Sequence, residues 1–555
     1  MAVAKHIQVY DTTLRDGCQS EDVSLTIADK VQIAQRLDDM GFDYIEGGWP
    51  GSNDRDAAFF GEIKKARLKH AKIAAFGSTR RAGVRAAQDR NLMLLLRAET
   101  PVATIVGKTW DFHVREALRI SEAQNLEILN DSIAFLKKHV DEAIFDAEHF
   151  FDGYFSNPEF AIACLKAVDE AKVDIICLCD TNGGRLPHEI DAALKAARAA
   201  VSCPIAIHCH NDSEVAVANT LAGVEAGATQ VQGTINGVGE RCGNANLVSI
   251  IANLQLKLGY NCVPQAKLKH LRELSMLVYE LANISPFARQ PYVGRSAFAH
   301  KAGLHASGIQ RNTHTYEHIE PESVGNDRRV LLSELSGRAN LIYKAREFGI
   351  ELDPANDKIE PLLDELKRLE GAGYVFDGAD ASFELLMLRK LGRAKDHFEF
   401  VSFRVFDDKW HEDQAPFSEA VVVIEGPDGV RTRNAAIGNG PVNALDSALR
   451  SALVPYYPNL ATMHLADYKV RVLDNGRGTA ARVRVLIEST DGKRRWGTVG
   501  LSDNVVEASW QALVDSVEYK LHKDNAKPRG RAQAKSNGAM PRASRTGAGA
   551  ADKTS

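Results

Sequence analysis

The chain has 555 residues, of which 45% are hydrophobic and 25% charged, and its formal net charge is −5. This composition is ordinary for a globular protein, and one hydrophobic core rarely grows past ~250–300 residues, so we expect several domains. The small negative charge gives no reason to expect a nucleic-acid partner. No apolar run approaches the ~18 residues of a membrane span. The N-terminal sequence also lacks the apolar region of a secretory signal.

All eight cysteines lie between Cys18 and Cys262, and several fall inside strand-like apolar runs such as DIICLCD. A secreted disulfide framework has a different distribution, so this one favours a reducing cytoplasm. The sequence contains no CxxC pair, which argues against a zinc knuckle or a thioredoxin-type site.

Short apolar segments rich in β-formers recur through the first half of the chain, separated by amphipathic helical patterns that often end in glycine. This alternation predicts a parallel sheet, and eight repeats favour a closed (β/α)8 barrel over an open doubly wound sheet. No GxGxxG follows the first strand, which further weakens the open-sheet alternative. The predicted strands cover residues 7–13, 43–49, 72–77, 102–108, 142–150, 174–180, 204–211 and 230–235.

The pattern changes twice after the barrel, which we assign to residues 1–265. Amphipathic segments predict helical subdomains over residues 266–395. Strand patterns with Gly, Asp and Asn turns, interrupted by helices at 441–453 and 504–521, predict an α+β domain over residues 396–520. Residues 521–555 have a basic excess and almost no large apolar residues. We expect a disordered tail there, more often a solubilising segment than a nucleic-acid arm.

Candidate catalytic residues follow from the barrel, because its active site lies where the strands end at their carboxyl termini. Polar residues occur at the ends of six of the predicted strands, and all of them should converge at one end of the barrel. They are Arg15, Asp16, Glu46, Glu148, Asp180, Thr181, Asn182, His208, His210, Asn211, Asp212, Glu240, Arg241 and Asn244.

His208 and His210 are the strongest metal-ligand candidates. Residues two apart on a strand share a face, so both imidazoles point one way and Cys209 the other. Two imidazoles with a carboxylate such as Asp16 make a site for a divalent cation. Asn244 could add an oxygen ligand. We expect Mg²⁺ or Mn²⁺, with Zn²⁺ possible; the alternative is a pair of hydrogen-bonded histidines in a polar barrel mouth.

Arg15, beside Asp16, suits capture of a carboxylate that also touches the metal. The alternative is a structural salt bridge at the barrel rim. Glu46 and Glu148 could each serve as a base or support another group, and the sequence does not rank them. Outside the barrel, a glycine-broken segment holds a second polar cluster that includes His305 and Tyr316. The alternative interpretation of this segment is a solvent-exposed linker whose histidines have no role in a site.

Four strings, DTTLRDGCQ, HCHND, GVGERCGNANL and HKAGLHASG, resemble the metal-dependent Claisen-condensing and lyase family, which includes the isopropylmalate, homocitrate and citramalate synthases. The resemblance runs from about residue 7 to about residue 520. YIEGGWPGSN, DAEHFFDGY and CDTNGG are most similar to the citramalate synthase branch. One departure is HASG, where isopropylmalate synthases often have HQDG, and it concerns the contacts around His305.

The resemblance implies a condensation of acetyl-CoA with pyruvate and water to give (R)-citramalate and CoA, on a route to isoleucine. It also implies that the metal is held by Asp16, His208, His210 and Asn244. In this reading Arg15, Thr181 and Glu46 bind the 2-oxo acid, while Glu148 and His305 help to remove a proton from acetyl-CoA. Tyr316 would assist as a donor or a positioning group.

For the C-terminal domain, the resemblance implies an allosteric dimer domain that binds the end-product amino acid. We expect isoleucine as the inhibitor; the alternative inhibitor is leucine. The resemblance further implies a domain-exchanged homodimer, in which His305 and Tyr316 could complete the partner's site. Two other functions stay open: a relative that uses 2-oxoisovalerate or 2-oxoglutarate, and a catalytically idle amino-acid sensor.

Overall fold

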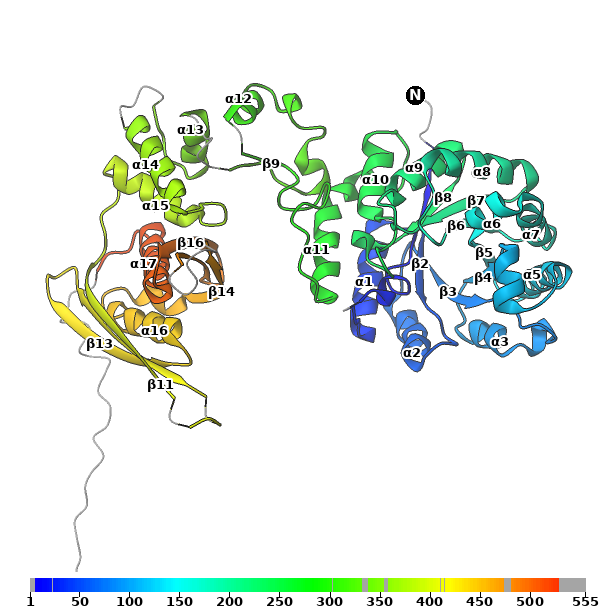
Figure 1. Cartoon of the computed structure of the whole chain (residues 1–555), viewed down its shortest axis with the longest axis horizontal. Helices are drawn as coiled ribbons and strands as arrows, with labels where there is room; N and C mark the ends of the chain where they lie inside the picture. The colour runs from blue at the N-terminus through cyan, green and yellow to red at the C-terminus, as the bar shows by residue number, and fades with distance from the viewer. Residues whose placement is uncertain are drawn as a thin grey trace, which may run out of the picture. The chain divides into compact units, whose positions relative to one another are not determined.

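The computed structural model describes residues 5–21, 23–301, 303–331, 338–353, 358–409, 411–413, 415–473 and 481–528 (Figure 1). The chain forms two compact units, one of residues 1–299 and 317–329 and the other of residues 300–316 and 330–555. Among the described helices, none has the length and apolar character needed to cross a membrane.

The first unit contains a closed barrel of eight parallel strands in sequence order, as the alternating pattern predicts. Each strand begins within a residue or two of its predicted start, and several end earlier than predicted. The strands are β1 (Gln8–Asp11), β2 (Tyr44–Gly48), β3 (Lys72–Ser78), β4 (Val102–Lys108), β5 (Glu142–Glu148), β6 (Ile175–Asp180), β7 (Ile205–Cys209) and β8 (Gln230–Gly233).

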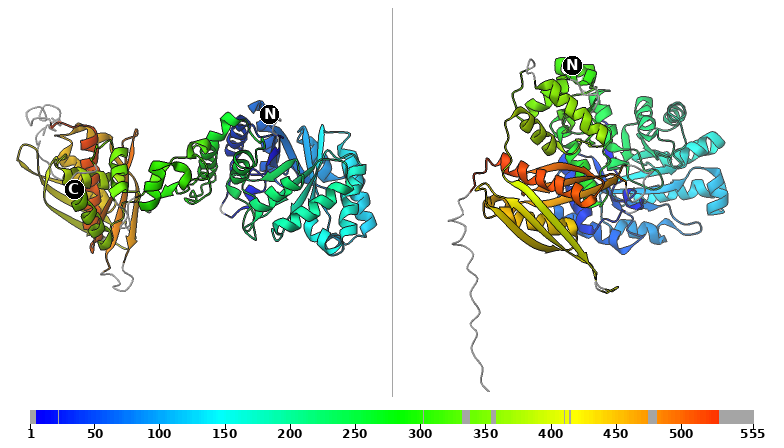
Figure 2. Two further views of the ribbon diagram at one scale, coloured as in Figure 1. Left: turned by 90° about the horizontal axis from the view of Figure 1, so that it is seen from above. Right: turned by 60° about the vertical axis from the view of Figure 1, so that its left-hand side comes forward.

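Helices surround the barrel in the views of Figures 1 and 2. The first of them is capped by Thr26, whose hydroxyl accepts a hydrogen bond from the Asp29 N–H in a capping box. The helices of this unit are α1 (Ile27–Met40), α2 (Asp54–Ile63), α3 (Arg90–Arg97), α4 (Asp111–His113), α5 (Glu122–Leu136), α6 (Phe150–Ser156), α7 (Pro158–Glu170), α8 (Pro187–Ala200), α9 (Ala216–Ala226), α10 (Leu247–Leu256) and α11 (Leu271–Leu281).

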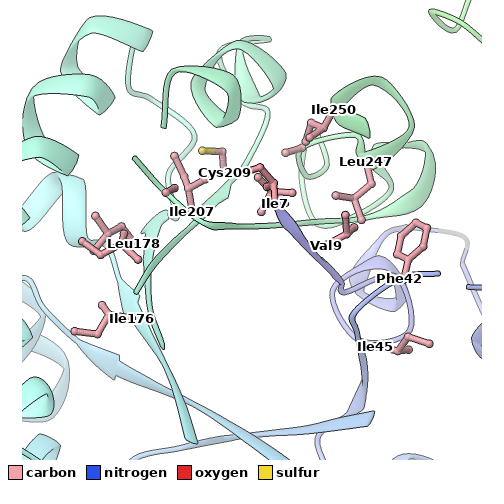
Figure 3. Packing of buried hydrophobic residues seen from close by; sticks show 14 of the residues in the cluster. Ile7, Val9, Phe42, Ile45, Ile176, Leu178, Ile207, Cys209, Leu247 and Ile250 are labelled. Atoms are coloured by element: carbon pink, nitrogen blue, oxygen red, sulfur yellow. The ribbon is translucent and has the colours of Figure 1, made fainter. Parts of the chain in front are cut away.

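The strands of the barrel separate two sets of side chains. On β6, Ile176 and Leu178 belong to the large core between the strands and the helices, whereas Cys177 and Cys179 belong to the small cluster inside the barrel. Figure 3 shows Ile207 and Cys209 of β7 on the helix side of the strand ring. Because side chains alternate along a strand, His208 lies on the inner face. The same alternation therefore packs the barrel and aims its functional residues inward.

The second unit is helical near its start and α+β towards its end. The helices are α12 (Gly303–Arg311), α13 (Arg338–Glu347), α14 (Ile359–Ala372) and α15 (Asp380–Leu391), and the short strands β9 (Ala299–His300) and β10 (Arg329–Val330) pair at the boundary of the two units. Two three-stranded antiparallel sheets follow, and each is followed by a helix. They are β11 (Glu399–Asp408), β12 (Phe417–Glu425) and β13 (Arg431–Gly438) with α16 (Pro441–Leu453), then β14 (His464–Val472), β15 (Val483–Thr490) and β16 (Arg495–Ser502) with α17 (Val505–Lys523).

Three features of this unit differ from the sequence expectation or extend it. β13 was not predicted, because its residues are mostly polar or small and show no hydrophobic alternation. α17 continues to Lys523 and so enters the segment expected to be a tail, while residues 529–555 lie outside the described residues. α15 packs on the last sheet: the Ser382 hydroxyl accepts a hydrogen bond of 3.0 Å from the Val499 N–H. The domain boundaries drawn from the sequence stay predictions.

Candidate active site

Three predicted metal ligands meet at the carboxyl ends of β1 and β7. Asp16, His208 and His210 are all buried, and one ligand atom of each lies within 4.8 Å of the others. The Nε2 atoms of the two histidines are 3.3 Å apart, and His208 Nε2 is 3.4 Å from Asp16 Oδ2. Within the described residues, the other group of this kind is Asp146 with Cys177 and Cys179.

Local backbone structure aims these side chains at one point. His208 is on the inner face of β7, and the His210 N–H donates to the Asp180 carbonyl 3.2 Å away. An isolated β-bridge joins His210 to Asn244 in the loop after β8. The Asn244 amide nitrogen donates to Asp16 Oδ2 at 3.1 Å and lies 3.2 Å from His208 Nε2. The structure thus brings together all four predicted metal-site residues.

The protonation of these residues fits a cation. Burial lowers the pKa of His208, and burial together with the neighbouring His208 lowers the pKa of His210 to about 4. Both rings are therefore neutral at pH 7, and each can offer a lone pair from Nε2. Burial alone would raise the pKa of Asp16, but Arg15, the two histidines and the hydrogen bond from Asn244 together hold that pKa below its ordinary value. Two neutral imidazoles and an ionised carboxylate form a donor set for a divalent cation.

One unpartnered atom supports the same interpretation. Within the described residues, Asn244 Oδ1 is buried and has no hydrogen-bond partner. A half-turn of the Asn244 amide would exchange Nδ2 for Oδ1 and direct an oxygen towards His208 and Asp16. By contrast, burial raises the pKa of Cys177 far above its usual value, and the pKa of Cys179 is about 11. Those thiols stay protonated at pH 7 and are poor ligands.

Arg15 is held from three sides next to this cluster. Its Nε donates to Glu46 Oε1 at 2.6 Å, its Nη1 donates to Asp16, and its guanidinium carbon lies 4.0 Å from the centre of the Phe76 ring. Burial alone would lower the pKa of Arg15, but the two carboxylates raise it above its ordinary value. The guanidinium is therefore permanently charged and fixed in orientation.

Glu46 is fully buried, and both of its carboxylate oxygens have partners. One oxygen accepts from Arg15, and the other accepts from the Tyr10 hydroxyl at 2.7 Å. Tyr10 is bound in turn to the Thr104 hydroxyl at 2.8 Å. This geometry makes Glu46 a support for Arg15. Direct contact between Glu46 and a substrate stays a prediction.

Glu148 ends β5, Thr181 follows β6, and the two are linked through His149. The His149 N–H donates to the Thr181 hydroxyl oxygen at 2.9 Å, and His149 has a left-handed backbone with φ of 56°. Its ring Nδ1 lies 3.0 Å from Asp152 Oδ2. Glu148 forms an ion pair with Lys108 at the end of β4. Two neighbouring strand ends thus present a carboxylate and a hydroxyl at the barrel mouth.

His305 and Tyr316 belong to the second unit. Their rings stack with centroids 4.1 Å apart and an interplanar angle of 27°, and both residues are exposed. The stacked pair is a preformed feature of that unit. The involvement of these two residues in the barrel site stays a prediction.

The remaining strand-end residues form pairs at the rim. Asp212 binds Arg241 at 2.8 Å, Asn182 binds Asp152 at 2.8 Å, and buried Asp180 accepts from the Arg185 N–H at 3.3 Å. Two residues near the site were missed by the sequence interpretation. Lys108 could have been found, because it ends a predicted strand; Phe76 carried no signal, because a strand phenylalanine is ordinarily core.

Three family models match successive parts of the chain. Residues 6–278 match the HMGL-like family, residues 292–373 the homocitrate synthase post-HMGL domain-like family, and residues 377–521 the LeuA allosteric (dimerisation) domain.

Full-length relatives include the (R)-citramalate synthases of Geobacter sulfurreducens and Aquifex aeolicus. The first is 58% identical over 517 residues, covering 93% of this chain and 98% of the relative, and the second is 54% identical over 523 residues, covering 94% and 99%. The 2-isopropylmalate synthase of Oceanobacillus iheyensis is 31% identical over 521 residues, covering 92% and 96%. These matches over nearly the full length of both relatives show that the chain belongs to the (R)-citramalate synthase family.

Proposed function

We propose that this protein is an acyltransferase that condenses acetyl-CoA with pyruvate and releases (R)-citramalate and CoA. The observation that carries the proposal is the 58% identity to an (R)-citramalate synthase over nearly the whole of both chains. The buried cluster of Asp16, His208 and His210 beside Arg15 supports it, because the condensation needs an electrophilic ketone next to a bound carboxylate.

Asp16, His208 and His210 would hold a divalent metal, with Asn244 as a weaker ligand or a support. The cation would be Mg²⁺ or Mn²⁺, with Zn²⁺ as an alternative. When bound, it would supply Lewis-acid polarisation of the ketone of the 2-oxo acid.

Arg15 and Thr181 would bind the carboxylate of pyruvate. Nε and Nη1 of Arg15 are occupied by Glu46 and Asp16, while Nη2 makes no hydrogen bond with any described residue and can donate to the substrate. The Thr181 hydroxyl oxygen accepts from the His149 N–H, which leaves its own hydrogen to donate. Two donors on separate strand ends would fix the acid in one orientation.

Glu148 would accept a proton from the methyl group of acetyl-CoA. This proton is weakly acidic, so the base needs to be positioned close to the electrophile. Lys108 holds one oxygen of Glu148 and thereby orients the carboxylate. His305 would assist in this proton transfer, and Tyr316, stacked on its ring, would orient it.

The test is CoA release, followed with a thiol reagent in the presence of Mg²⁺ or Mn²⁺, acetyl-CoA and a panel of 2-oxo acids. We expect a clear preference for pyruvate. Preference for 2-oxoisovalerate or 2-oxoglutarate would leave the proposed mechanism intact and contradict the proposal that pyruvate is the substrate. The absence of turnover with every acid and metal would overturn the proposal in favour of an amino-acid sensor.

We further propose a homodimer that is inhibited by isoleucine and works in the cytoplasm. The match of residues 377–521 to the LeuA allosteric (dimerisation) domain supports the first two points. Phe406 and Ile437 lie in one cross-strand row of the β11–β12–β13 sheet, each opposite Glu419 of the central strand, and both are largely exposed. A second copy could cover this face. All eight cysteines are free thiols, as is usual in a reducing compartment.

A further inference from the structure

A cavity of about 300 Å³ lies at the carboxyl ends of β2 and β3, beside the site described above. Trp49, Ser52, Ser78, Arg81, Arg90 and Asn91 contribute to its lining. A neighbouring cavity of about 410 Å³ includes Arg15 in its wall. The two cavities share Trp49 and Ser52, so they adjoin each other on the same rim of the barrel.

The cavity carries two positive charges that the described part of the protein leaves unneutralised. Arg81 and Arg90 are exposed, and neither side chain forms an ion pair or a hydrogen bond with any described residue. Arg80, the preceding residue, is by contrast paired with Glu127 at 3.1 Å and Asp131 at 2.6 Å.

The nearest acid in the sequence, Asp89, cannot serve these arginines as a counterion without losing its present partners. It is buried, and its carboxylate accepts three backbone N–H groups, those of Arg81 at 3.0 Å, Asn91 at 2.9 Å and Leu92 at 3.1 Å. These bonds fix the loop that carries Arg81 to the start of α3. The backbone that carries the two arginines is thus ordered, and neither guanidinium group has a counterion among the described residues.

A series of side-chain contacts links this cavity to Arg15. The Trp49 indole N–H donates to Asn91 Oδ1 at 2.9 Å, and the Asn91 amide donates to the Ser78 carbonyl at 2.6 Å. The Trp49 ring meets Phe76 edge-on at 5.4 Å, and Phe76 lies under the Arg15 guanidinium. The cationic cavity is therefore linked through Trp49 and Phe76 to Arg15, the residue proposed to bind the 2-oxo acid.

Acetyl-CoA has the chemistry that this arrangement fits. Its acetyl thioester must reach the electrophile beside Arg15, while its other end is an adenosine 3′-phosphate 5′-diphosphate that carries several negative charges. Arginine is well suited to bind phosphate oxygens in pairs. We propose, on the basis of the proposed function, that Arg81 and Arg90 bind the phosphate groups of acetyl-CoA in this cavity.

Substrates of decreasing length test this assignment. The variants Arg81→Gln and Arg81→Gln/Arg90→Gln would be assayed with acetyl-CoA, with acetyl-dephospho-CoA, which lacks the 3′-phosphate, and with S-acetylpantetheine, which lacks the nucleotide. We expect the KM for acetyl-CoA to rise roughly tenfold or more, because charge-assisted bonds are lost, with kcat and the KM for pyruvate unchanged. The KM for S-acetylpantetheine should be the same in variant and unaltered enzyme.

The dephospho substrate distinguishes the two kinds of phosphate. If the variants lose all discrimination between acetyl-CoA and acetyl-dephospho-CoA, the cavity binds the 3′-phosphate; if they keep it, the cavity binds the diphosphate. The matched control is Arg85→Gln, because Arg85 is an exposed arginine of the same loop that lines a different cavity. It should leave every KM unchanged.

An unchanged KM for acetyl-CoA in the double variant would overturn the inference, as would an equal rise with S-acetylpantetheine. Both outcomes leave the proposed function intact if the unaltered enzyme releases CoA with pyruvate. If the unaltered enzyme is inactive, calorimetric titration with CoA decides the inference alone. Binding that the double variant weakens about tenfold supports it, and equal binding overturns it.

Discussion

Arg15 shows how one side chain can be prepared for binding before a substrate arrives. Its planar group lies on the Phe76 ring and is held at two edges by Glu46 and Asp16. A fixed guanidinium loses little conformational freedom when it binds a carboxylate. The same contact with Asp16 is the largest of the interactions that lower the pKa of that carboxyl group against the effect of burial. The residue that would bind the 2-oxo acid and the residue that would bind the metal thus support each other.

His208 and His210, at the carboxyl end of β7, allow a sharp test at the residue scale. His208→Ala removes an inward-facing ligand, so we expect bound divalent metal to fall below stoichiometric amounts and CoA release to drop by several orders of magnitude. Metal content would be measured by atomic emission after gel filtration. Cys209→Ala is the matched control, because Cys209 lies between the two histidines and faces the helices. Full metal content and normal turnover in His208→Ala would remove these residues from the site.

At the scale of elements, the barrel strands were predictable because short apolar, largely buried segments alternate with helical patterns, and the site followed because its residues stand at the strand ends. The loop after β8 was predictable only in part. The sequence indicates that Asn244 belongs to the site, but the β-bridge to His210 that places it depends on tertiary contacts. Phe76 and Arg81 were not predictable, because a strand phenylalanine and a loop arginine have no distinctive pattern.

The loop after β8 should depend on a glycine. Gly243 has a φ of +89°, and a Cβ built there would lie 2.1 Å from the Gly237 carbonyl oxygen, whose bond to the Asn244 N–H holds the turn. Gly243→Ala should therefore displace Asn244 and lower both metal affinity and kcat about tenfold or more. Gly259→Ala is the matched control, because its φ of +72° imposes similar strain but its Cβ would meet open space. Equal activity in the two variants would show that the loop tolerates the shift.

At the scale of the whole molecule, the C-terminal domain is continuous with the helices before it. Val499 of β16 belongs to the hydrophobic cluster of α14 and α15, and Arg389 of α15 pairs with Asp515 of α17 at 3.0 Å. Cutting the chain near residue 395 would leave those helices without part of their core. The role of this domain is therefore better tested by substitutions on its surface than by truncation.

The exposed face of the β11–β12–β13 sheet is the place for such substitutions. Ile437 is 68% exposed and Phe406 54%, and burying side chains of this size against a second copy would contribute ~1.5–3 kcal/mol each. We expect Phe406→Glu/Ile437→Glu to weaken the homodimer at least a hundredfold by sedimentation equilibrium and to abolish inhibition by isoleucine. The melting temperature should change little, because neither side chain is part of a buried core.

Leu258→Glu, at an exposed apolar position of the barrel unit, is the control and should leave the dimer intact. If the double variant stays dimeric and remains sensitive to isoleucine, the dimer contact and the regulatory coupling must lie on another face.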